Sequence, residues 1–87
     1  MELDWSLLRT VLAVADHGSL SGAARHLGQS QPTLGRHVKS AEQALACTLF
    51  KRQARGLVPT TACMALLPQL RAMAASAAQL RLNAAGH

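Results

Sequence analysis

Aromatic residues are nearly absent from this chain of 87 residues. Trp5 and Phe50 make up 2% of the total, and there is no tyrosine. An interior without large rings must be filled by Leu, Val, Ala and Met, which favours packed helices over a β-sandwich. With 49% hydrophobic residues at this length, the sequence predicts one small, mainly α-helical domain.

Cysteine and long apolar runs are also scarce. Cys47 and Cys63 lack the spacing of a CxxC motif, and no secretory signal precedes them. We therefore expect two unpaired thiols in a reducing cytoplasm. No apolar stretch approaches the roughly 20 residues that span a bilayer, so we expect a soluble protein without a membrane partner.

Patterns typical of enzymes are missing as well. The stretch "GSLSG" has leucine at its centre and fails the G-x-S-x-G nucleophile pattern. There is no Walker loop and no H-E-x-x-H motif, and the histidines at 17, 26, 37 and 87 show no metal-ligand spacing. We expect neither an enzyme nor a metal or cofactor site.

Acidic residues number only four, against nine Lys and Arg, which gives a formal net charge of +5. The excess is concentrated in residues 17–60, where six basic residues face only Glu42. Such a positive field on one part of a small surface attracts a polyanion. A solvated basic surface without a partner is the alternative.

Polar caps and glycines divide the first 27 residues into two helices. Asp4 can cap a helix over residues 5–17, which Gly18 then ends in a left-handed conformation. Ser19 or Ser21 can cap a second, short helix that ends before the next glycine.

A short connection leads into a third helix. Only residues 28–30 separate the second helix from the next, which forces the two axes to cross steeply, and the small Ala23 and Ala24 suit a close crossing. Ser30 or Gln31 can cap the third helix, with Pro32 in its first turn and a last residue near 45. At 100° per residue its inward face carries Leu34, Val38, Ala41 and Leu45, and its outward face Pro32, Arg36, Lys39 and Gln43. This is a helix-turn-helix.

The segment after Ala46 predicts a short β-hairpin. Strand-forming residues at 49–50 and 57–58 flank a turn with Gly56, and we expect Lys51, Arg52 and Arg55 at its tip. The predicted fold is thus a three-helix core with a hairpin wing.

A long helix follows, capped by Thr60 or Thr61. Apolar residues recur along it in alternating steps of four and three, the 3.5-residue repeat of a coiled-coil seam. We expect a homodimer interface formed by Leu66, Leu70, Met73, Ala77 and Leu80, with Ala84 at its end. Pro68 lies opposite this seam. The alternative is a helix that folds back onto its own domain.

The third helix suits double-stranded DNA. A B-DNA major groove about 12 Å wide admits one helix, and helix-turn-helix proteins insert the N-terminal residues of the second helix of the motif. Arg36 can donate to guanine O6 and N7, Gln31 can pair with adenine, and Pro32 and the Thr33 methyl can touch a thymine methyl. The predicted DNA-binding residues are Gln29, Ser30, Gln31, Pro32, Thr33, Gly35, Arg36, Lys39, Arg52 and Arg55.

Within this set, Gln29, Ser30 and Lys39 suit phosphates, and the wing arginines suit the adjacent minor groove or its backbone. Each assignment has a simpler alternative. Gln31 could only cap the helix, Arg36 could be a solvated charge, and Lys39 could pair with Glu42.

The run "LRTVLAVADHGSLSGAARHLGQSQPTLGRHVKSAEQALACTLFKR", continuing to "RGLVPTTA", closely resembles the N-terminal winged helix-turn-helix of LysR-type transcriptional regulators. The resemblance implies a bacterial, cytoplasmic, nucleoid-associated regulator that dimerises through a long linker helix, often assembles further as a tetramer, and binds partly palindromic operators. It places base contacts at Gln31, Pro32, Gly35 and Arg36, and a wing contact at Arg55.

The resemblance also implies domain limits. Residues 1–59 correspond to the winged DNA-binding domain and residues 60–87 to the linker or dimerisation helix. A small-molecule effector domain normally follows, and we expect neither that domain nor its ligand in this chain. Two alternatives are a dimerisation module that pairs with full-length regulators without reading DNA, and the similar winged domain of molybdate-type regulators.

Three positions depart from the family pattern. Serine is usual where this chain has Gly35, so one hydroxyl donor is missing and the helix is weakened by about 1 kcal/mol relative to alanine. Leucine is usual at Ala41 and glycine at Ala46, so we expect changes in packing and in the exit from the third helix.

Overall fold

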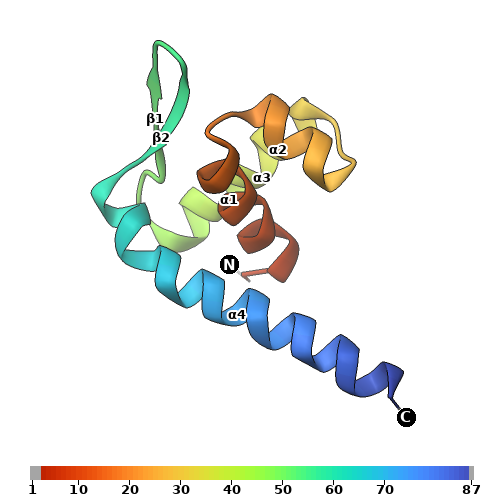
Figure 1. Cartoon of the computed structure of the whole chain (residues 1–87). Helices are drawn as coiled ribbons and strands as arrows, with labels where there is room; N and C mark the ends of the chain where they lie inside the picture. Colours follow the sequence, from red (N-terminus) through yellow and green to blue (C-terminus); the bar gives the residue numbers. More distant parts are fainter. Residues whose placement is uncertain (1–2, 87) are drawn as a thin grey trace.

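Four helices and one β-hairpin make up the computed structural model, which describes residues 3–86. Their order is α1 (Trp5–His17), α2 (Leu20–Leu27), α3 (Gln31–Leu45), β1 (Phe50–Gln53), β2 (Gly56–Pro59) and α4 (Thr61–Ala85). The predicted winged helix-turn-helix with a long C-terminal helix is confirmed (Figure 1). Glu2 and His87, which entered the charge and histidine patterns, lie outside the described residues.

Side-chain caps fix the helix starts close to where the sequence predicts them. Asp4 accepts a hydrogen bond from the backbone N–H of Ser6, at 3.0 Å. Where two caps were open, the first residue of each pair is the cap, namely Ser19, Ser30 and Thr60. These oxygens satisfy backbone N–H groups that have no partner inside the helix.

Left-handed residues end the first three helices. Gly18 and Gly28 have φ values of 71° and 66°, as the sequence predicts. Ala46 ends α3 with φ 56° and ψ 40°, a conformation in which its Cβ crowds the backbone. The exit from α3 therefore follows the same path as a glycine exit, at an energetic cost.

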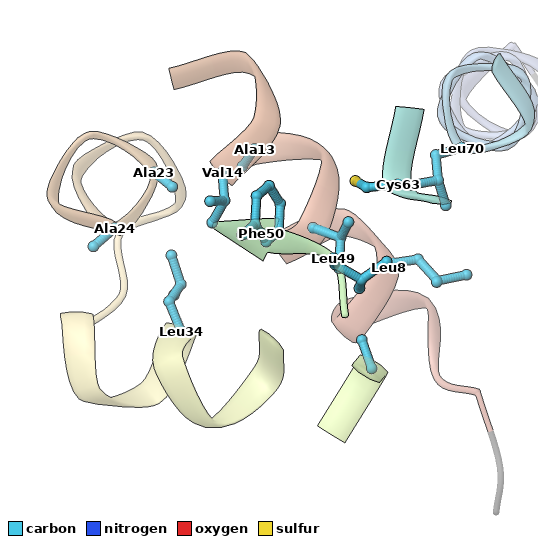
Figure 2. Packing of buried hydrophobic residues seen from close by; sticks show 12 residues of the cluster. Leu8, Ala13, Val14, Ala23, Ala24, Leu34, Leu49, Phe50, Cys63 and Leu70 are labelled. Carbon is cyan, nitrogen blue, oxygen red and sulfur yellow. The ribbon is translucent and has the colours of Figure 1, made fainter. Parts of the chain in front are cut away.

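The core lies where α1 meets α2, α3, the wing and the start of α4. Its fully buried members include Val14, Ala23, Leu34, Leu49 and Cys63, each with 0% exposure. Figure 2 shows Leu34 pointing from α3 toward Ala23 and Ala24 of α2. A larger side chain at Ala23 would push α2 away from this core, which is why a small residue suits the crossing.

The hairpin differs from the sequence prediction in where its basic residues lie. Gln53 pairs with Gly56, so the turn consists of Ala54 and Arg55 alone. Lys51 and Arg52 therefore lie within β1, and the prediction that both occupy the tip is wrong. Leu49 precedes the strand and is buried in the core.

The first half of α4 packs on its own domain. Cys63 is fully buried, Leu70 is 6% exposed, and Leu66 is half-buried against the core. Arg71 forms an ion pair with Asp16 of α1, with Nη2 and Oδ1 2.9 Å apart. The chain's own domain thus covers Leu70 and part of Leu66, as in the fold-back alternative, while the dimer interface stays a prediction.

The second half of α4 extends beyond the other elements (Figure 1). Met73 is 43% exposed, Leu80 70% and Leu82 68%. Ala77 is half-buried beside α1, and Pro68 is exposed, away from the core. Along the predicted seam, the first strongly exposed apolar residue is therefore Met73.

Candidate nucleic-acid interface

The outward face of α3 is exposed as predicted. Pro32, Arg36, Lys39 and Gln43 are all exposed, whereas Leu34 and Ala41 are fully buried on the opposite side. The helix therefore presents a polar and basic face to solvent while its apolar face fixes it to the core.

The start of α3 is a small hydrogen-bonded cluster. Ser30 Oγ accepts the backbone N–H of Thr33 at 3.3 Å and donates to Thr33 Oγ1 at 2.8 Å. Arg36 Nη2 donates to the same Thr33 oxygen at 3.3 Å. Since Ser30 is the cap, the alternative in which Gln31 only caps the helix is wrong, and the Gln31 amide is exposed.

Lys39 has no acidic partner within the described chain. Glu42 Oε2 instead accepts the backbone N–H of Leu49 at 2.7 Å and thereby ties the end of α3 to the loop before the wing. Across residues 3–86 the only ion pair is that between Asp16 and Arg71. The alternative in which Lys39 pairs with Glu42 is therefore wrong, and the lysine charge faces solvent.

The wing brings Arg52 beside the start of α3. Arg52, Gln31, Ser19 and Ser21 line one open hollow of about 220 Å³. Arg55 lies apart from it, in the turn at the wing tip. The structure thus gathers Gln31 and Arg52, far apart in the sequence, and keeps Arg55 at the far end of the hairpin.

Ser19 and Ser21 escaped the sequence-based set of site residues. The only signal in the sequence was that both serines could cap α2. Since one of them is enough for the cap, the hydroxyl of the other is available for a different contact. Ser19 is that cap, and the Ser21 hydroxyl stays exposed 3.4 Å from Ser19 Oγ, beside Gln31 and Arg52.

Gly35 leaves a gap in the exposed face of α3. A Cβ at this position would meet no atom within 4 Å apart from its own helix backbone. The glycine is therefore required neither by packing nor by backbone conformation, and it opens the helix surface next to Arg36.

Two titratable groups, Cys63 and His37, lie at contacts between helices and the core. Burial raises the pKa of the Cys63 thiol, which keeps it protonated and unreactive. His37 Nδ1 lies 3.0 Å from the hydroxyl of Thr10, a link between α1 and α3.

Within residues 3–86, no three His, Cys, Asp or Glu side chains are placed to share a metal ion. In the same range, no helix has the length and apolar character to cross a membrane.

Comparison with known proteins gives consistent matches. A small neutral protease regulatory protein of Streptomyces coelicolor is 50% identical over 60 residues, which cover 69% of this chain and 18% of that protein. A crystal structure of the CbnR DNA-binding domain with DNA is 31% identical, with a TM-score of 0.81, and the match covers 98% of this chain and all of that one. The OxyR C206 mutant of Corynebacterium glutamicum has a TM-score of 0.94 at 28% identity, covering 99% of this chain and 28% of that one.

This chain spans 17–34% of the length of the first three curated regulators that it matches. The family model of bacterial regulatory helix-turn-helix proteins of the lysR family matches residues 5–64, from the first residue of α1 into the first turn of α4. With α3 and the wing arranged as described above, the chain belongs to the LysR family of bacterial regulatory helix-turn-helix proteins.

Proposed function

We propose that this chain binds double-stranded DNA in a sequence-specific manner and so directs transcription regulation, by binding rather than catalysis. The observation that carries the proposal is the exposed face of α3, where Arg36 and Lys39 lack acidic partners. The first residue of this helix, Gln31, lines a hollow together with the wing residue Arg52. A related DNA-binding domain of the same family has been solved with DNA bound. A protein with this role acts on the bacterial chromosome, in the cytoplasm.

In this proposal the N-terminal half of α3 enters the major groove. Gln31 and Arg36 contact base edges, where the arginine fork matches guanine O6 and N7 and the amide matches adenine. Pro32 and the Thr33 methyl face a thymine methyl, and Gly35 allows close approach. Ser30 remains mainly a cap.

Phosphate contacts come from the surroundings of that helix. Lys39 is exposed on α3 itself and Gln29 is exposed just before it, and the hollow lined by Arg52 and Ser21 can receive a phosphate oxygen. Arg55 at the wing tip reaches toward the adjacent minor groove. These contacts orient the domain on the duplex, while the α3 side chains select the sequence.

Dimerisation through α4 completes the proposal, with residues 60–87 as the linker helix. An apolar groove of about 400 Å³ is lined by Leu3, Leu45, Leu66 and Met73 among others, and Leu80 is exposed further along the same helix. A second copy of α4 would cover this surface and place two recognition helices on a partly palindromic operator.

Substitution of Arg36 tests the DNA contact. We expect Arg36→Ala to lose about 1 to 3 kcal/mol of binding free energy on a duplex selected from a random pool, and much less on a scrambled duplex. Arg9→Ala is the matched control, because Arg9 is also an exposed arginine but lies on α1 beside α4. Fluorescence anisotropy at about 0.1 M salt measures both.

Two outcomes would contradict the proposal. Equal losses on both duplexes would remove Arg36 from base readout. Absence of a preferred duplex, together with no salt dependence of binding, would favour a pairing module that does not read DNA.

A further inference from the structure

The Thr33 hydroxyl stands at the centre of the exposed start of α3. Its oxygen accepts two hydrogen bonds, from Ser30 Oγ at 2.8 Å and from Arg36 Nη2 at 3.3 Å. Both donors are exposed, and Thr33 itself is half-buried. The Thr33 oxygen therefore joins Ser30, which caps the helix, to Arg36, the main candidate for contacts with bases.

The position of this oxygen is well determined by its surroundings. Thr33 is branched at Cβ, so its first side-chain torsion has few accessible values in a helix. Its backbone N–H is held by Ser30 Oγ at 3.3 Å, within the same turn. The threonine is thus fixed at both its backbone and its hydroxyl before any ligand arrives.

The side chain of Arg36, in contrast, is long and flexible, so it loses conformational entropy when it binds a ligand. An exposed arginine carries about 2 kcal/mol of rotamer entropy, and each contact that fixes it in advance reduces the loss on binding. Residues three apart on a helix lie on neighbouring positions of one face, so Thr33 can hold the guanidinium without bending the chain.

The contact leaves the reading capacity of the guanidinium intact. Of its five N–H donors one is used by Thr33, and four remain for the two acceptors of a guanine. No acidic side chain in residues 3–86 forms an ion pair with Arg36. The uncharged hydroxyl oxygen of Thr33 therefore holds the guanidinium in place without neutralising its positive charge, which DNA attracts.

We propose that Thr33 is a positioning residue, which sets the direction of the Arg36 guanidinium and thereby sharpens its readout of guanine. The inference rests on the proposed DNA-binding function. It assigns Thr33 a role beyond methyl contact, through its hydroxyl group and through another residue.

The test compares variants of the 87-residue chain on one duplex that the wild-type chain selects from a random pool. Thr33→Val keeps the branched shape and the methyl group of threonine and replaces its hydroxyl by a second methyl. We expect it to weaken binding to the selected duplex about fivefold, the factor that one hydrogen bond is typically worth, and to leave binding to a scrambled duplex unchanged. Thr33→Ser restores the hydroxyl and should bind within about twofold of the wild type.

Arg36→Ala and the double variant Thr33→Val with Arg36→Ala distinguish a positioning role from a structural one. If Thr33 acts through Arg36, the double variant binds the selected duplex no more weakly than Arg36→Ala alone. If Thr33 has only a structural role, Thr33→Val would weaken DNA binding by the same factor in the wild type and in Arg36→Ala. Thermal unfolding of each variant controls for folding, since valine and threonine have similar helix propensity.

Three results would overturn the inference. Thr33→Val could bind the selected duplex as tightly as the wild type, Thr33→Ser could bind as weakly as Thr33→Val, or the threonine change could keep its full effect when Arg36 is absent. These results leave the proposed function standing. If the wild-type chain selects no duplex at all, the proposed function fails and this inference fails with it.

Discussion

The backbone N–H of Leu57 in the wing donates a hydrogen bond of 2.9 Å to the carbonyl oxygen of Gly18, the residue that ends α1. The neighbouring Gly56 lies so close to the same oxygen that a Cβ at this position would overlap it. Gly56 also has φ +131°, which side chains rarely adopt. Backbone contact, together with the packing of Phe50, therefore sets the direction of the wing relative to the helix-turn-helix.

Substitution of Gly56 by alanine should detach the wing. The overlap with Gly18 and the strained φ act together, so we expect the free energy of unfolding to fall by about 1 to 3 kcal/mol or more. Urea unfolding followed by circular dichroism measures this loss. Binding to the selected duplex should weaken as well, because the wing would no longer hold Arg52 beside the start of α3 or fix the position of Arg55 at its tip.

Gly28→Ala is the matched control for this substitution. Gly28 also has a positive φ, of 66°, but a Cβ there meets no atom within 4 Å. Alanine should therefore cost only the left-handed conformation, about 1 kcal/mol. Equal losses at the two glycines would show that the contact with Gly18 has no role.

Ala46 is the one non-glycine residue with positive φ in residues 3–86, at the end of α3. Glycine adopts the same conformation without crowding between Cβ and the backbone, so Ala46→Gly should raise the free energy of unfolding by about 1 kcal/mol. Ala44→Gly, inside the same helix, should lower it by about 1 kcal/mol. A loss in both variants would mean that the Ala46 side chain contributes packing that offsets its strain.

The parts of this structure that the sequence predicts are those decided within a few residues. Asp4 and Gly18 act through neighbours two to four positions away, so the limits of α1 follow from local chemistry. The inward placement of Leu34 follows from helix periodicity in the same way. The wing is less well predicted, because the two-residue turn depends on which residues of β1 and β2 pair.

Two further features depend on the tertiary arrangement. Arg52 meets Gln31 only because the wing docks on Gly18, a contact with no sequence signature. The apolar stripe of α4 is ambiguous for another reason. Over fewer than three heptads, a coiled-coil seam and a stripe facing the helix's own domain differ by too little in period to be told apart.

Two leucines of α4 that share the predicted seam differ in exposure, and we therefore predict opposite effects of their substitution. Leu70 is 6% exposed in the core, so Leu70→Ala should lower the free energy of unfolding by about 2 to 5 kcal/mol. Leu80 is 70% exposed on the seam, so Leu80→Ala should leave the fold of one chain intact and weaken dimerisation, measured by analytical ultracentrifugation.

Leu82 provides the control for the dimer measurement. It is 68% exposed, close to the value of Leu80, but lies outside the 3.5-residue repeat. Leu82→Ala should therefore leave the dimerisation constant unchanged. If both leucines matter equally, or neither matters, the seam is not the dimer interface.

The Asp4 cap predicts how α1 responds to acid. The hydrogen bond from the Ser6 backbone N–H, reinforced by the Ser6 side chain and slightly by the charge of His37, holds the pKa of this carboxyl below its ordinary value of 3.8. A carboxyl whose pKa is lowered by folding contributes stability above 3.8, and that contribution is lost as the pH falls through the folded value.

The variant Asp4→Asn tests this dependence, because asparagine keeps a capping oxygen but does not titrate. We therefore expect urea unfolding to show the wild type losing stability relative to Asp4→Asn below pH 3.8, with a constant difference near neutral pH. Parallel curves for the two proteins throughout the acid range would exclude the cap as the titrating group, because only the aspartate can take up the proton.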